Sequence, residues 1–171
     1  PSQLPKEAEV AKNIIPYYDR ESGTLTELLT EREEVTGKDD VIVSVYTGWL
    51  YTISDSGEIL EKNELPLPEE VNSPGSGIVL PDEVICSGYT RTEEPVVWKV
   101  ERTTGKITST GSVQDMIGNQ DFYPHTYAFD EEGRIYGTDN YTVFCVSADL
   151  LFLRIGSIVK LLFCVHYFDI D

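Results

Sequence analysis

The side chains that could bind a metal ion lie close together in one acidic stretch, which contains Asp115, Asn119 and Asp121. Their oxygens are of the kind that calcium prefers, but calcium takes about six to eight of them. The spacing differs from that of an EF-hand, and glycine is missing from the position that such a loop requires. We expect a solvated loop here or, alternatively, the mouth of a ligand-binding site that could take a divalent cation such as calcium.

Two tryptophans, Trp49 and Trp98, form a second group of candidates, because each stands near the start of a predicted strand. Aromatic side chains in that place could line a ligand-binding mouth. They also bury large areas of apolar surface, so packing in the core is the alternative interpretation.

Motifs for common catalytic chemistry are missing from the sequence. We find no nucleophile elbow, phosphate-binding loop, HExxH or dinucleotide fingerprint. Only His125 and His166 are available for Ser/His/Asp catalysis, which is therefore poorly supported. Cys86, Cys145 and Cys164 are odd in number and widely spaced, so the sequence predicts neither a zinc site nor a disulfide framework.

The net charge of −17 over 171 residues limits the possible partners. A chain of this length is expected to form one domain. Nucleic acid and anionic membranes are unfavourable partners, because binding them requires a basic surface. A cationic ligand, a metal ion or a basic protein is electrostatically easier, although the charge could serve solubility alone.

One pattern recurs along the chain: an alternating apolar run, a polar turn with a marker residue, and a second alternating run. Such a pattern is typical of a β-hairpin, since glycine supplies the positive φ that a tight turn needs. The marker positions are 34, 48 and 45 residues apart, which is close to the repeat of about 40–50 residues of a four-stranded propeller blade. The copies lie at 17–25, 50–60, 98–107 and 143–151, with markers Gly23, Gly57, Gly105 and, in place of glycine, Leu150.

Runs rich in β-branched or small residues precede the later hairpins and complete the expected strand order. They lie at 40–46, 83–88 and 133–138, with further runs at 77–80 and 125–129. The order of four strands per unit predicts an all-β fold, namely a β-propeller of four-stranded antiparallel blades. About three to four blades fit into residues 1–155, so we expect an incomplete propeller or, alternatively, a four-bladed one with a poor closing blade.

The remaining segments are expected to be loops or ends. Residues 65–77 and 113–124 are rich in turn-forming residues and predict loops, whereas 7–15 has a short helical pattern. Residues 156–171 form an atypical apolar tail, which we interpret as a final strand or a truncated end. The chain begins Pro1-Ser2-Gln3, so we expect a missing or processed N-terminus.

The stretch 123–139, YPHTYAFDEEGRIYGTD, resembles the blade signature of six-bladed propellers. Similar sequences occur in NHL-type repeats and in the gluconolactonase and strictosidine-synthase-like families. The turns Thr-Thr-Gly-Lys-Ile and Asp-Ser-Gly-Glu-Ile look equally similar to pyrroloquinoline-quinone-type repeat propellers. The resemblance covers about residues 40–150 and implies a propeller fold, with an extracytoplasmic or secreted setting favoured.

The resemblance to gluconolactonases implies a metal-binding role for Asp139. Where that family has asparagine after a proline, this sequence has His125. A His/Asp pair could bind a divalent cation, and the carboxylate could act as a base toward metal-bound water. The alternative is that Asp139-Asn140 is a structural turn, which these residue types favour.

A recognisable repeat without a strong catalytic constellation favours a binding or scaffold module for a protein or small-molecule ligand. Fold alone does not determine the chemistry of such a module. Two alternatives remain: a metal-assisted hydrolase of the lactonase kind, and a fragment of a quinone-dependent dehydrogenase.

Overall fold

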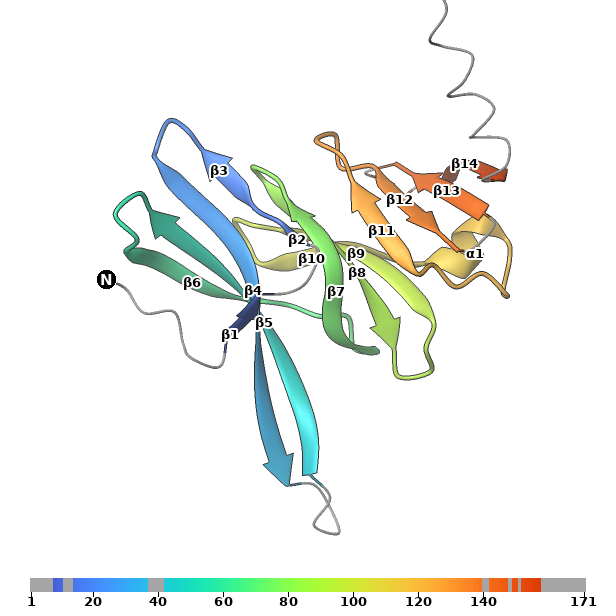
Figure 1. Ribbon diagram of the computed structural model, residues 1–171, viewed down its shortest axis with the longest axis horizontal. Helices are drawn as coiled ribbons and strands as arrows, with labels where there is room; N and C mark the ends of the chain where they lie inside the picture. Colours follow the sequence, from blue (N-terminus) through green and yellow to red (C-terminus); the bar gives the residue numbers. More distant parts are fainter. Residues whose placement is uncertain are drawn as a thin grey trace, which may run out of the picture.

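Three largely antiparallel β-sheets lie side by side in the computed structural model (Figure 1), which confirms the predicted all-β class. The structure describes residues 8–10, 14–36, 42–139, 142–147, 149–150 and 152–157. Within these ranges the three sheets form an open row and do not close into a ring. No helix among the described residues is long and apolar enough to span a membrane.

The first sheet contains four consecutive strands and one added N-terminal strand. Its four strands run up and down, and β1 (Ala8–Val10) pairs with β4 beyond the end of β3. The consecutive strands are β3 (Tyr17–Asp19), β4 (Thr24–Thr36), β5 (Ile42–Ser54) and β6 (Ile59–Leu65).

The second sheet repeats this arrangement in the middle of the row. Strand β2 (Ile14–Ile15) adds to it by pairing in parallel with β7. The consecutive strands are β7 (Val71–Val79), β8 (Glu83–Thr90), β9 (Pro95–Glu101) and β10 (Lys106–Ser112).

A short helix, α1 (Val113–Ile117), leads from the second sheet into the third. The third sheet again has four consecutive antiparallel strands. They are β11 (Thr126–Phe129), β12 (Ile135–Thr138), β13 (Thr142–Val146) and β14 (Phe152–Ser157).

The middle of the second sheet is buried on both faces. Successive side chains of a strand point to opposite faces, and each face packs against a neighbouring sheet. Val84 and Cys86 pack toward Leu28 and Leu50 of the first sheet. Ile85, between them, joins a second cluster with residues of α1 and the third sheet. The central strands β8 and β9 therefore have nearly continuous runs of buried residues, whereas the edge strand β10 alternates between exposed and half-buried residues.

The predicted hairpin turns are confirmed by the backbone conformation of their marker residues. Gly23, Gly57 and Gly105 have φ angles of 65°, 81° and 63°. Leu150 adopts φ 59°, so it occupies the left-handed conformation that glycine has in the other copies. Its side chain packs against the core between the second and third sheets, which offsets part of the cost of this conformation.

The prediction of a loop over 65–77 is wrong in its second half, where β7 begins at Val71. Pro74 lies between two register shifts with β8, and bulges of this kind accept a proline inside a sheet. Gly77 is required by close packing, since an added Cβ would lie 2.5 Å from the carbonyl oxygen of Ile85.

The predicted boundaries also differ from the structure in the first sheet and around α1. The strand expected at 40–46 and the first strand of the hairpin expected at 50–60 form a single strand, β5. It pairs with β4 along its whole length. Together they form a hairpin that extends away from the row of sheets (Figure 1). The segment with helical pattern contains β1 and β2 instead, and part of the loop at 113–124 forms α1. Most of the atypical tail, from residue 158 onward, lies outside the described residues.

Candidate functional site

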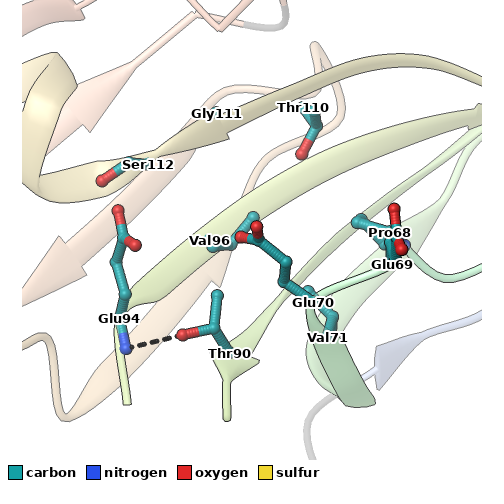
Figure 2. A pocket seen from close by; sticks show the side chains of 10 residues that line it. All are labelled: Pro68, Glu69, Glu70, Val71, Thr90, Glu94, Val96, Thr110, Gly111 and Ser112. Atoms are coloured by element: carbon teal, nitrogen blue, oxygen red, sulfur yellow. Dashed lines mark hydrogen bonds between the residues drawn. The ribbon is translucent and has the colours of Figure 1, made fainter. Parts of the chain in front are cut away.

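A groove with acidic walls lies at one end of the second sheet, on the side that faces the first sheet. It consists of two adjoining cavities of about 350 and 650 Å³ that share Glu69, Glu70, Thr90 and Glu94. Figure 2 shows the first cavity, in which the side chains of Glu70 and Glu94 rise on either side of Thr90. We call this feature the acidic groove.

Strand ends place the groove residues next to one another. The segment that leads into β7 supplies Glu69 and Glu70, and the turn between β8 and β9 supplies Thr90 and Glu94. The end of β10 closes one side with Ser112. Because alternate connections of an up-and-down sheet meet at the same end, residues distant in sequence converge here.

A network of hydrogen bonds holds the turn between β8 and β9. The hydroxyl of Thr90 accepts hydrogen bonds from the backbone N–H groups of Thr92 and Glu94, at 3.3 and 3.1 Å. The backbone N–H of Arg91 donates to the carbonyl of Glu70 at 3.2 Å and thereby joins the two walls of the groove. Glu93 has φ 66°, a conformation that few residues other than glycine adopt.

The groove has a negative field. Three carboxylates line its two cavities, and Arg91 is the one basic residue among the described lining residues. Thr90, Thr110 and Ser112 add hydroxyl groups, and Val71 and Val96 add an apolar floor. No three His, Cys, Asp or Glu side chains of the described chain are placed to hold one metal ion. The groove therefore combines negative charge and hydroxyl groups with an apolar floor.

The predicted acidic loop is held by local contacts of its own side chains. Asp115 accepts a hydrogen bond of 2.8 Å from the side-chain amide of Gln120. The side-chain oxygen of Asn119 accepts from the backbone N–H of Asp121 at 3.1 Å. The loop is anchored beneath by the fully buried Phe122. Asp115 thus lies in α1, and Asn119 and Asp121 lie in the loop that follows it. A ligand-binding role for the three residues stays a prediction.

The two tryptophans have different environments. Trp98 is completely buried between the first and second sheets, where it packs with Leu28 and Val84. Trp49 lies in the first sheet, with the ammonium group of Lys62 4.1 Å from the centre of its ring. Neither residue lines the acidic groove.

His125 and Asp139 come together at one end of the third sheet. The backbone N–H of His125 donates to the carbonyl of Thr138 at 2.8 Å, next to Asp139. The carboxylate of Asp139 accepts a hydrogen bond of 2.7 Å from the backbone N–H of Thr142 and so closes the turn into β13. A metal-binding role for this pair stays a prediction, which thermal melting with added calcium or zinc would test.

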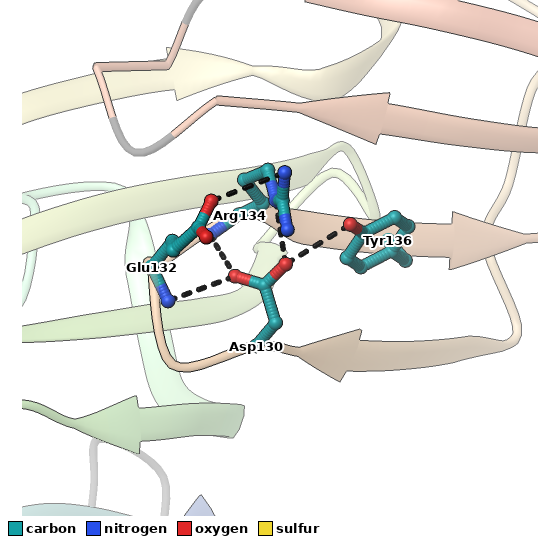
Figure 3. Close-up of polar contacts among 4 residues, drawn as sticks. All are labelled: Asp130, Glu132, Arg134 and Tyr136. Carbon is teal, nitrogen blue, oxygen red and sulfur yellow. Dashed lines mark hydrogen bonds and ion pairs between the residues drawn. The ribbon is translucent and has the colours of Figure 1, made fainter.

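Part of the stretch 123–139 forms a cluster of polar contacts in the hairpin of β11 and β12. Asp130 accepts hydrogen bonds from the side chains of Arg134 and Tyr136, at 2.6 and 3.0 Å (Figure 3). It also accepts from the backbone N–H groups of Glu132 and Arg134. Burial disfavours its carboxylate, but these hydrogen bonds outweigh burial and lower the pKa of Asp130. Asp130 therefore holds the turn together.

No sequence motif marks the groove residues as a site. Glu69 and Glu70 lie in the segment predicted as a loop, which was the one available signal. Glu94 lies beyond β8 in a turn without any motif, and only the folded sheet brings it beside Glu70.

Comparisons with known proteins add no family. No protein-family model matches the chain, and no curated protein matches it. Among solved structures, a protein of unknown function from Bacteroides caccae is similar with a TM-score of 0.26 and 10% identity. That similarity covers 91% of this chain and 84% of the other. At this level it carries no inference about fold or function.

Proposed function

We propose that this protein is a binding module that holds a basic segment or another organic cation in the acidic groove. The observation that carries the proposal is the convergence of Glu69, Glu70 and Glu94 on one groove from two separate connections. The net charge of −17 supports it, because a negative field attracts cations and repels anionic competitors.

We further propose that the three sheets are successive blades of a propeller. Two features support this: each sheet has four consecutive antiparallel strands, and β7 lies next to both β11 and the first sheet. Propellers present their ligands with the loops at one end of the blades. A crystal structure of the protein tests the idea. Strands β3, β7 and β11 should then surround a common axis, and three sheets in a flat row would contradict the proposal.

The binding proposal is tested with a short lysine-rich peptide and its glutamate counterpart, measured by fluorescence anisotropy at physiological salt. We expect saturable binding of the lysine peptide alone. The double change Glu70→Gln and Glu94→Gln should weaken that binding about tenfold, since ion pairs that are not fully buried contribute up to about 1 kcal/mol each and about 1.4 kcal/mol corresponds to a factor of ten.

The matched control is the double change Glu58→Gln and Glu131→Gln. Both residues are exposed and lie outside the groove, and the net charge changes by the same amount. The control should alter binding by no more than about twofold, as exposed charges contribute little. Equal losses in the two double variants, or no binding of the lysine peptide, would contradict the proposal.

A further inference from the structure

A separate cavity of about 410 Å³ lies between the first and second sheets, at the end of the second sheet opposite the acidic groove. Pro81, in the connection from β7 to β8, and Thr103, in the turn from β9 to β10, contribute to it. Its volume falls within the range of small-molecule sites, roughly 300–1,000 Å³. This cavity shares no residue with the acidic groove.

One wall of the cavity is a polar row on the inner face of the first sheet. Thr26 pairs with Thr52 across β4 and β5, and Thr52 pairs with Glu61 across β5 and β6. The next row on the same face contains Leu50 and Asn63. Facing sheets normally bury apolar side chains between them. Here the apolar face becomes polar where the cavity opens.

Arg102 of the second sheet forms the opposite wall, and its guanidinium is held in a defined place. It donates to the carbonyl oxygens of Leu80 and Pro81, at 3.0 and 2.8 Å. It also donates to the hydroxyl of the buried Thr26, at 2.7 Å. These acceptors are all neutral, and a guanidinium has N–H donors beyond those that three contacts use.

Glu61 carries the opposite charge and lines the same cavity. Within the described part of the chain, its side chain makes no hydrogen bond or ion pair, and it forms none with Arg102. The cavity therefore presents one cation and one anion that face a shared space without neutralising each other.

We propose that this cavity binds a small zwitterion, namely a free α-amino acid. The ligand's carboxylate accepts hydrogen bonds from the remaining N–H donors of Arg102, and its ammonium group donates to Glu61. Asn63 and Thr103 provide further hydrogen-bonding groups beside them. A ligand without net charge avoids the repulsion that a net charge of −17 exerts on anions and that Arg102 exerts on cations. This site goes beyond the proposed function, because it is independent of the acidic groove.

Isothermal titration calorimetry with a set of the common free L-amino acids tests the proposal. Each amino acid is compared with its N-acetyl form, which lacks the ammonium group, and its amide, which lacks the carboxylate. We expect saturable binding of at least one free amino acid and a loss of about tenfold or more for both blocked forms. If no free amino acid binds, or if the blocked forms bind equally well, the proposal is overturned.

The variant Glu61→Gln keeps the shape of the side chain and should weaken binding about tenfold or more. Glu64→Gln is the matched control, because Glu64 lies on the same strand, pairs with Trp49 and faces away from the cavity. It should leave the affinity unchanged. An equal loss in the two variants would overturn the proposal, since general charge attraction would then explain binding. Glu70→Gln, in the acidic groove, should leave amino-acid binding unchanged. Failure of the amino-acid proposal can therefore be distinguished from failure of the acidic-groove proposal.

Discussion

Gly77 and Gly105 show two different reasons for glycine in one chain. At Gly77 the space is closed by the carbonyl oxygen of Ile85, whereas at Gly105 an added Cβ would meet nothing within 4 Å. Only the conformation, φ 63°, requires glycine at position 105. The turn pattern in the sequence predicts the need for glycine at position 105. The need at position 77 arises only from contact with the neighbouring strand β8.

These two causes predict unequal losses of stability. Gly105→Ala should lower the free energy of unfolding by about 1 kcal/mol, the cost of a left-handed conformation. Gly77→Ala should lower it by about 3 kcal/mol, because the neighbouring backbone must shift. Urea unfolding of both variants checks the difference. Equal losses would mean that β7 and β8 are farther apart than the structure shows.

At the scale of the element, a single carboxylate organises the hairpin of β11 and β12. Asp130 joins the turn backbone to Arg134 and Tyr136, and Arg134 also forms an ion pair of 3.1 Å with Glu132. The stretch 123–139, which resembles a propeller blade, therefore has a structural role in this chain, because it forms this turn.

Asp130→Ala should lower the free energy of unfolding at pH 7 by about 2 kcal/mol, since hydrogen bonds to a charged group are lost. The pKa of Asp130 is lowered by folding, so its stabilisation is present above the unfolded pKa of about 3.9. The stabilisation is lost as the pH falls from there through the folded pKa. The difference between wild type and variant should therefore shrink at acid pH.

Urea unfolding between pH 7 and pH 2.5 (about the lower limit of the window in which an aspartate titrates) measures this difference. The exposed neighbour Glu131 makes no hydrogen bond or ion pair in the described chain, so Glu131→Ala is the control. A difference between wild type and Asp130→Ala that does not change with pH would contradict the role assigned to the carboxylate.

The elements themselves were predictable where local rules decide them. The hairpins at Gly57 and Gly105 follow from alternation and turn chemistry, and they occur as expected. Strand β7 was missed because Pro74 and its glycines have the composition of a loop. Pairing with β8 overrides that composition, and no property of the segment alone indicates it.

At the scale of the whole molecule, stability should decrease from the middle of the row outward. The second sheet is covered on both faces, whereas the hairpin of β4 and β5 extends from the row with exposed Val35, Ile42 and Val45. A two-stranded hairpin without further cover is only marginally stable in water.

Hydrogen exchange followed by mass spectrometry should show this gradient. Peptides from β8 and β9 should exchange slowest, and those from 32–36 and 42–47 should exchange about a hundredfold faster or more. Protection of the hairpin equal to that of β8 would contradict the arrangement, since it would require a cover that the described chain does not supply.

The sequence by itself determined the all-β class, the positions of most hairpins and the negative charge. These depend on local periodicity, on positive φ at turns and on composition. Only the tertiary structure decided which faces the sheets cover and which charged groups meet. Glu70 and Glu94, like Glu61 and Arg102, are brought together by connections that end at the same edge or by facing sheets. Alternation shows that a side chain leaves one face of a strand, but not which sheet lies opposite, because that depends on pairing between distant segments.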